Sequence, residues 1–432
     1  MTPVSPLLIR KGRVIDIRSG LDGCRDLLIR GGKVARIGNR LSAGKGTRIF
    51  EAAGMIVCPG LIDMHVHLRE PGFEDKETIA SGSRAAAHGG FTTVACMPNT
   101  LPVHDRAEVT RMIRTLIDAT AVVRVMPVAA VTRELAGAEL VDFAGLRELG
   151  VVGFSNDGHV VAGSRTLREA LVRIRRIGSV LIEHPEDEAL SGEGVVHEGF
   201  LSRKYGLPGI SSLSEDAIIQ RDLAIQRQVG SRLHLTHVST RKAKDLIQAA
   251  KRENGGVSAD VTPHHLLLND EMADPLTPAY KVKPPIRSEA DRQALIRGIS
   301  DGTFDCIASD HAPHTRAEKA LGIRQAPFGI SGVETLVPLI FDRFVTRGIL
   351  SVHQMIRLLT VNPAQILGVP DRGQLRVGGD ADVTVIDPRP EYTIHGEFFH
   401  SKSANSPFIG WRVRGEVSLT VVGGRIVYQG GR

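Results

Sequence analysis

Residues 61–72 of the chain read LIDMHVHLREPG. The first part is a short apolar run of the kind that forms a buried strand, and it closes on His65 and His67. Residues two apart on a strand point to the same face, so both imidazoles are expected to point the same way. One histidine at a strand end is more often a hydrogen-bonded packing residue than a metal ligand. The pair therefore predicts a metal site only if other ligands converge on it.

The sequence around this stretch alternates short apolar runs with longer segments of helical periodicity, which predicts βαβ units and a parallel sheet. Eight candidate strands follow one another: 61–67, 91–97, 121–131, 150–156, 179–184, 231–237, 255–261 and 304–310. Eight strands with intervening helices over about 300 residues are typical of a TIM-type (β/α)₈ barrel. An open doubly wound sheet is the alternative, but no GxGxxG motif follows the first strand.

The two ends of the chain share a sequence pattern that differs from that of the middle. Residues 7–57 and the segment after Gly373 contain alternating apolar residues broken by glycine turns such as those at Gly31-Gly32 and Gly423-Gly424. This pattern predicts antiparallel strands. We expect the ends to pair into one small β-sandwich, from residues 1–57 and 366–432, around a hydrolase barrel at 58–365. Two independent hairpin caps are the alternative.

Composition narrows the class of protein. The chain has 432 residues, 42% hydrophobic and 24% charged, with a formal net charge of +6 and only 4% aromatic residues. Scattered Lys and Arg with few aromatics argue against nucleic acid as a partner. The four cysteines form no CxxC pair, which favours free thiols over disulfides or a cysteine zinc site. No long apolar segment and no signal-peptide pattern are present, so we expect a cytoplasmic protein with no membrane contact.

Potential metal ligands recur at the ends of the predicted strands, where a barrel of this type has its active site. They are His65, His67, Asp157, His184, His237 and Asp310. Four imidazoles and two carboxylates suit zinc or a similar ion, and they exceed what one closed tetrahedral site needs. We therefore expect two Zn²⁺ ions per chain and metal-assisted hydrolysis of the substrate, or the reverse reaction.

A family resemblance rests on motifs spread over nearly the whole chain. They are HVHLREPG (65–72), MPNT (97–100), FSNDG (154–158), EHPED (183–187), HVST (237–240), TPHH (262–265), SDHAPH (309–314) and APFG (326–329). Together they resemble the amidohydrolase superfamily, and specifically its type I dihydroorotases. The resemblance implies a cyclic-amide hydrolase that interconverts dihydroorotate and N-carbamoyl-aspartate in pyrimidine synthesis.

The resemblance also implies roles for single residues. His65, His67 and Asp310 would hold one metal, His184 and His237 the second, with Asp157 as the bridge. Asp310 would also take the proton of the attacking water and pass it to the leaving ring nitrogen. Substrate contacts would come from Arg69, Asn99, His314 and the segment Phe328-Gly329.

Two features test this assignment. Many superfamily members bridge their metals with a carbamylated lysine, but this chain has no lysine between Lys76 and Lys204. That gap disfavours a hydantoinase or allantoinase, which remain alternatives. The second feature is Lys283, in YKVKPPIR, where the family usually has Asn. We expect its ammonium to contact the substrate carboxylate, or else to turn away from it.

Partners follow from the resemblance alone. Type I dihydroorotases often associate with aspartate transcarbamoylase, so that enzyme and a homo-oligomer are the expected partners beside the small-molecule substrate. Two other classes of protein remain alternatives. A catalytically silent subunit that scaffolds the transcarbamoylase would be expected to lose metal ligands, and a metal-storage protein would not need the substrate-type residues.

Overall fold

The computed structural model describes residues 5–253, 255–274 and 277–430. Its centre is an eight-stranded parallel sheet in which neighbouring strands follow chain order. The strands are β6 (Leu61–Val66), β7 (Phe91–Cys96), β8 (Arg124–Ala129), β9 (Gly153–Phe154), β10 (Leu181–Glu183), β13 (Leu233–Leu235), β14 (Val257–Val261) and β15 (Cys306–Ile307). Each overlaps one predicted strand, and the predicted barrel is confirmed.

The last strand comes back to the first. A bridge joins Val66 to His311, and the backbone N–H of His67 donates to the carbonyl of His311 at 2.8 Å. The sheet is therefore a nearly closed barrel, not an open doubly wound sheet.

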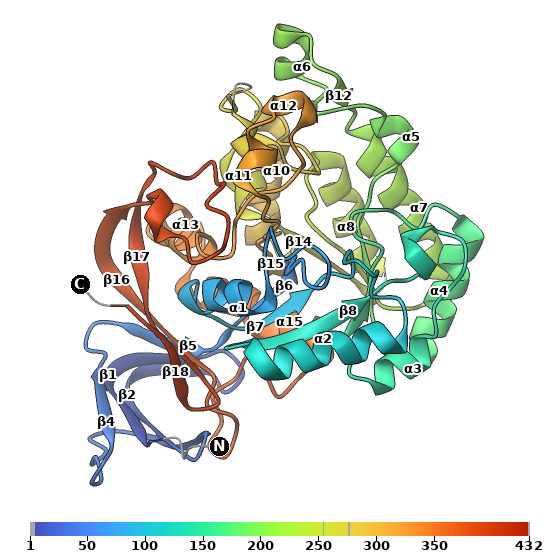
Figure 1. Ribbon diagram of the computed structural model, residues 1–432. Helices are drawn as coiled ribbons and strands as arrows, with labels where there is room; N and C mark the ends of the chain where they lie inside the picture. The colour runs from blue at the N-terminus through green and yellow to red at the C-terminus, as the bar shows by residue number, and fades with distance from the viewer. Residues whose placement is uncertain (1–4, 254, 275–276, 431–432) are drawn as a thin grey trace.

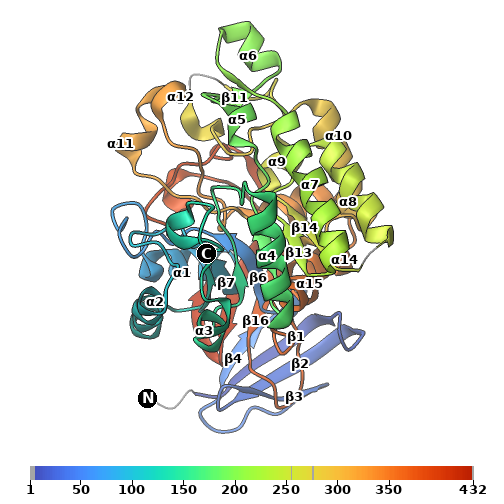
Figure 2. The same cartoon turned by 90° about the vertical axis from the view of Figure 1, so that its right-hand side faces the viewer.

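Helices surround the barrel strands (Figures 1 and 2). They are α1 (Ile79–His88), α2 (Ala107–Thr120), α3 (Phe143–Glu148), α4 (Ser164–Arg176), α7 (Leu213–Val229), α8 (Arg241–Glu253), α10 (Glu289–Ser300), α13 (Leu336–Ile340), α14 (Val352–Leu359) and α15 (Val361–Ile366). Helix α4 shows why they pack there, because Leu167, Ala170, Leu171 and Ile174 are buried along one face at helical spacing. None of the described helices combines the length and the apolar run that crossing a membrane requires.

Short elements lie in the connections above the barrel. They are α5 (Glu188–Ser191), α6 (Phe200–Tyr205), α9 (Pro263–Leu267), α11 (Arg316–Lys319), α12 (Gly322–Gln325), the paired strands β11 (Val196–His197) and β12 (Gly209–Ile210), and the single turns η1 (Arg133–Leu135) and η2 (Pro278–Tyr280). Two further short turns lie elsewhere: η3 (Phe341–Val345) follows α13 directly, and η4 (Gly396–Phe398) lies in the C-terminal part of the chain. In Figure 1 α6 and α12 lie at the end of the molecule opposite the small sheet.

The two chain ends form one mixed sheet, coloured blue and red in Figure 1. Its strands are β1 (Leu7–Asp16), β2 (Leu21–Arg30), β3 (Lys33–Gly38), β4 (Arg48–Glu51), β5 (Ile56–Pro59), β16 (Val383–Thr393), β17 (Arg412–Val422) and β18 (Arg425–Gln429). The joint is the antiparallel pairing of β5 with β16, where Val57 lies opposite Val385. The ends are therefore one unit and not two separate caps.

This sheet has its own apolar core. Side chains from both ends, among them Ile9, Leu27, Val385 and Leu419, are almost fully buried against one another. All four cysteines are free; Cys24 is exposed and the other three are buried.

Candidate metal centre

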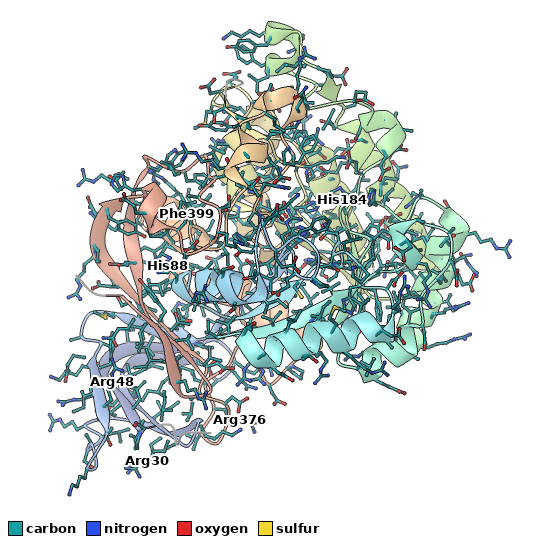
Figure 3. All side chains as sticks on the ribbon, in the orientation of Figure 1. Arg30, Arg48, His88, His184, Arg376 and Phe399 are labelled. Atoms are coloured by element: carbon teal, nitrogen blue, oxygen red, sulfur yellow. The ribbon has the colours of Figure 1, made fainter. Side chains whose placement is uncertain are left out.

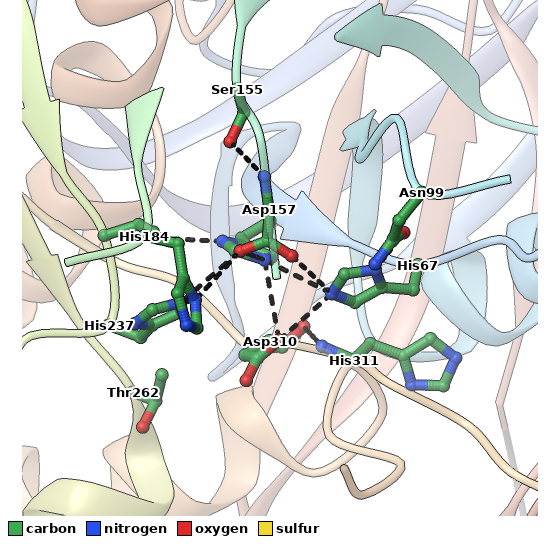
Figure 4. A network of polar contacts seen from close by, with 12 residues as sticks. His67, Asn99, Ser155, Asp157, His184, His237, Thr262, Asp310 and His311 are labelled. Atoms are coloured by element: carbon green, nitrogen blue, oxygen red, sulfur yellow. Dashed lines mark hydrogen bonds and ion pairs between the residues drawn. The ribbon is translucent and has the colours of Figure 1, made fainter. Parts of the chain in front are cut away.

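The six predicted ligands come together at the carboxyl ends of the barrel strands (Figure 4). Their side chains are almost completely buried, and Asp157 lies in their midst. Its carboxylate oxygens lie 3.4–3.5 Å from ring nitrogens of all four histidines: His65, His67, His184 and His237. Asp310 lies on the other side of the first two histidines, with Oδ1 at 3.5 Å from His65 Nε2 and 3.4 Å from His67 Nε2.

The way the ring nitrogens face each other fits a bound cation. His65 Nε2 lies 3.3 Å from His67 Nε2, and His184 Nδ1 lies 2.9 Å from His237 Nε2. Two lone pairs this close repel each other unless a proton or a metal ion lies between them. Two sets of three ligand atoms each gather within 4.8 Å: His65, His67 and Asp310, and His65, Asp157 and His237. A donor set of imidazole and carboxylate suits zinc or a similar divalent ion.

Polar residues behind three of the imidazoles determine which nitrogen faces the centre. His65 Nδ1 lies 2.8 Å from the hydroxyl of Thr236, which donates to Asp260. His67 Nδ1 lies 2.9 Å from Asn99 Oδ1. When an oxygen accepts a hydrogen bond from one ring N–H, the other ring nitrogen carries the lone pair that can bind a metal. Metal-binding histidines are usually oriented in this way.

His184 has the opposite orientation. Its Nε2 lies 3.0 Å from Glu186 Oε2, so that Nδ1 faces Asp157 and His237. Sequence reasoning assigned no role to Glu186, Thr236 or Asp260. The first had a usable signal, because it follows His184 by two residues and thus lies on the same side of an extended segment.

Electrostatics in the centre are dominated by its carboxylates. Burial on its own would lower the pKa of His65, but the charges of Asp157 and Asp310 raise it to about 9. Burial opposes ionisation of the two carboxyl groups, yet the surrounding imidazoles hold the pKa of each far below its usual range. Protons on the imidazoles thus balance the charge of the two carboxylates, and a bound metal cation would take the place of these protons.

The backbone is strained at three residues of the site. Arg69, His237 and Asp310 have positive φ values of 63°, 39° and 47°. Residues other than glycine rarely adopt this region, and such outliers concentrate at functional sites.

A pocket of about 500 Å³ opens over the centre. Its lining includes the residues expected to contact substrate: Arg69, Asn99, His314, Lys283, Phe328 and Gly329. The structure thus brings these side chains to the pocket that predicted ligands such as His184 also line. His184 is labelled in Figure 3.

Side chains of neighbouring residues fix the backbone of the pocket wall formed by Phe328 and Gly329. The Phe328 carbonyl lies 2.8 Å from His314 Nε2, and Lys319 Nζ donates to the carbonyl of Gly329 at 2.9 Å. Gly329 has φ 129°, and a Cβ there would lie 2.6 Å from the carbonyl oxygen of Ala312. Only glycine fits this close approach.

The two cationic side chains of the pocket, Arg69 and Lys283, contact different partners. Arg69 donates from Nε to the carbonyl of Pro313 at 3.2 Å, and its Nη2 lies 3.2 Å from His314 Nε2. The ammonium of Lys283 lies 3.0 Å from Glu186 Oε2 and 5.5 Å from the centre of the Phe328 ring.

Comparison with known proteins agrees with this geometry. Residues 54–243 match the Dihydro-orotase-like family, and residues 219–428 match the Amidohydrolase family. A dihydroorotase of Syntrophus aciditrophicus (strain SB) is 45% identical over 424 residues, 98% of this chain and 99% of the relative. One of Geobacillus thermodenitrificans (strain NG80-2) is 46% identical over 402 residues, 93% of this chain and 94% of the relative.

Solved structures show the same architecture. The L-hydantoinase (dihydropyrimidinase) of Arthrobacter aurescens superposes with a TM-score of 0.88 at 26% identity, covering 99% of this chain and 97% of that one. The dihydropyrimidinase of Brevibacillus agri NCHU1002 gives 0.83 at 25% identity, covering 98% and 95%. Since relatives of about 45% identity span both chains almost completely, the chain belongs to the dihydroorotase family of amidohydrolases.

Proposed function

We propose that this chain is a zinc-dependent dihydroorotase. It would catalyse the reversible hydrolysis of the cyclic amide of (S)-dihydroorotate to N-carbamoyl-L-aspartate, a reaction of de novo pyrimidine (UMP) synthesis. The observation that carries the proposal is the position of Arg69, a half-buried cation that lines the pocket over the six convergent metal ligands. A cyclic amide that carries a carboxylate is the kind of substrate that needs both.

The metal would be held by this chain's own residues. His65, His67 and Asp310 form one set of ligands, His184 and His237 a second, and Asp157 contacts both sets. Bound zinc ions polarise a substrate carbonyl and lower the pKa of water, which is the chemistry that amide hydrolysis requires. We expect two zinc ions per chain, because the ligands exceed what one tetrahedral ion can use.

Proton transfer falls to Asp310. Its carboxylate lines the pocket and lies 3.4 Å from His67 Nε2, so its oxygens are placed to exchange a proton with a molecule bound there. It would take the proton of the attacking water and deliver it to the ring nitrogen that leaves. In the synthetic direction the same carboxylate would take the proton from the ureido nitrogen that closes the ring.

The substrate would be oriented by groups of the pocket wall. Arg69 would hold the carboxylate, because a planar guanidinium can bind both of its oxygens. Asn99, His314 and the segment Phe328-Gly329 would complete the contacts. A direct contact between Lys283 and the carboxylate stays a prediction, since the ammonium already pairs with Glu186.

A substrate comparison tests the proposal. Purified protein loaded with zinc should interconvert dihydroorotate and N-carbamoyl-aspartate, and elemental analysis should approach two zinc ions per chain. Hydantoin and allantoin, which lack the ring carboxylate, should be poor substrates. Turnover of either at a higher kcat/KM than dihydroorotate would replace this substrate with another cyclic amide. A well-folded, zinc-loaded protein without turnover of any of them would favour the silent scaffolding subunit.

A further inference from the structure

Behind the metal centre, three side chains form a line of contacts that leads away from His184. His184 Nε2 lies 3.0 Å from Glu186 Oε2, and the same oxygen lies 3.0 Å from the ammonium of Lys283. The side chain of Glu186 is only 6% exposed, whereas that of Lys283 is 30% exposed and reaches the pocket. The line therefore joins a candidate metal ligand to a lysine of the pocket wall.

The first contact decides the tautomer of His184. A carboxylate only accepts hydrogen bonds, so the proton of the imidazole must be on Nε2. The lone pair is then on Nδ1, the atom that faces Asp157 and His237. The other three histidines of the centre face it through Nε2, so Glu186 is what turns His184 the other way round.

The second contact holds Glu186 itself. Its Oε2 lies 3.0 Å from His184 Nε2 and 3.0 Å from the ammonium of Lys283, so one carboxylate oxygen joins the imidazole to the lysine. Without a cation beside it, a buried carboxylate next to the pocket would lose hydration and would repel an anionic substrate. Lys283 supplies that cation.

We propose that Glu186 is a positioning residue for His184 and that Lys283 acts through Glu186, as its counter-ion. This inference rests on the proposed function, because it assigns His184 to the metal. It gives Lys283 a role at the metal centre that does not need direct contact with the substrate.

Zinc affinity tests the inference without turnover. Chelator competition on the full-length protein, with Zn²⁺ as the only probe, should show that Glu186→Ala weakens binding about 10–100-fold, the usual effect of losing the partner of a metal-binding histidine. Glu186→Gln keeps an oxygen that accepts the Nε2–H, so it should weaken binding less. Lys283→Met should weaken binding by about two- to fivefold, the range expected for a partly exposed ion pair.

The double variant tests whether the two residues act as one unit. If Lys283 acts through Glu186, adding Lys283→Met to Glu186→Ala should cause no further loss of zinc affinity. Lys283→Arg, which keeps the cation, should restore most of the affinity. Independent losses that multiply in the double variant would overturn the inference, and so would a Lys283→Met protein with the zinc affinity of the wild type.

Lys281 provides the matched control. Its Nζ donates to the carbonyl of Arg324 at 3.1 Å and lies 4.6 Å from the centre of the Phe328 ring, so it supports the same wall without an ion pair to Glu186. Lys281→Met should leave zinc affinity unchanged. If Lys281→Met lowers it as much as Lys283→Met, the effect belongs to the wall and the inference is wrong.

The two proposals can fail separately. If the wild type does not turn over dihydroorotate but the order of zinc affinities holds, only the proposed substrate is refuted and the positioning role stands. If dihydroorotate is turned over and Lys283→Met raises its KM with unchanged zinc affinity, Lys283 binds the substrate and the positioning role falls.

Discussion

Replacing Arg69 with methionine tests the proposed substrate more directly than any other single change. Methionine keeps an unbranched apolar side chain but has no charge and no N–H donor. Both residues bear a Cβ, so the strain of the positive φ at this position is common to both. The comparison therefore isolates the guanidinium.

The magnitude follows from the position of Arg69, which is half-buried in the pocket wall. Burial lowers the pKa of the guanidinium to about 10, and the charges of Asp310 and Asp157 oppose that effect. Arg69 thus remains a cation at neutral pH. Removing one partner of a buried, hydrogen-bonded charge pair costs about 2–5 kcal/mol. At about 1.4 kcal/mol per factor of ten, kcat/KM for dihydroorotate should fall by about 30-fold to several thousand-fold.

Steady-state kinetics in both directions measures this loss, and two comparisons make it specific. Arg69→Lys keeps a charge but not the planar pair of donors, so it should fall between wild type and Arg69→Met. Dihydrouracil, the same ring without the carboxylate, should be turned over by Arg69→Met as well as by wild type. Arg69 also contacts Pro313 and His314 near the centre, so zinc content is measured as a control. It should stay constant, because Arg69 is not one of the six proposed ligands. The reasoning is refuted if Arg69→Met lowers kcat/KM for the two rings equally.

Three further predictions concern other parts of the molecule. Asp310→Asn should lower kcat by about 10²–10⁴-fold while zinc-loaded protein still binds N-carbamoyl-aspartate, since acid–base catalysis supplies about that factor; an active variant would remove Asp310 from proton transfer. His104 is buried with ring nitrogens 2.9 Å from the Val128 carbonyl and 2.7 Å from the Thr110 hydroxyl, and burial lowers its pKa to about 4. Its folded pKa is below the unfolded value of about 6.5, so the stability that its neutral form contributes is complete above pH 6.5 and is lost as the pH falls toward 4, by up to about 3 kcal/mol. Urea unfolding at pH 6.5 and pH 4.5 should show this extra loss in the wild type and not in His104→Gln; equal losses in both would contradict it. Mixing the chain with the cognate aspartate transcarbamoylase should shift its elution in size-exclusion chromatography and raise kcat, and unchanged elution with unchanged kinetics would count against that partner.

The sequence alone was enough to predict the barrel and the position of its site. The longer segments of helical periodicity between the predicted strands correspond to helices such as α7 and α8. Periodicity works here because a strand or helix buried on one face must repeat its apolar residues at the period of that element. The ligands were visible because carboxyl ends of parallel strands meet at one mouth, so residues such as His65 and Asp310 can be brought together before any coordinates are known.

The local sequence pattern predicted the structure less accurately where strands are short or pair with distant parts of the chain. Strands β9 and β15 have only two residues each, whereas the runs that predicted them have seven. The joining of the chain ends through β5 and β16 is a pairing of residues more than 300 positions apart, and composition suggested it without defining its register.

Only the tertiary structure decided what lies behind the ligands. The contacts of Thr236 with His65, and of Lys283 with Glu186, join side chains about 100 or more residues apart. Their distances depend on how loops above the barrel pack, and no period in the sequence encodes that packing. The sequence therefore determined which groups meet at the mouth of the barrel, because strand topology alone brings them there. The orientation of each imidazole and the partner of Lys283 were decided by tertiary packing, because a hydrogen bond depends on tenths of an ångström that only the assembled fold defines.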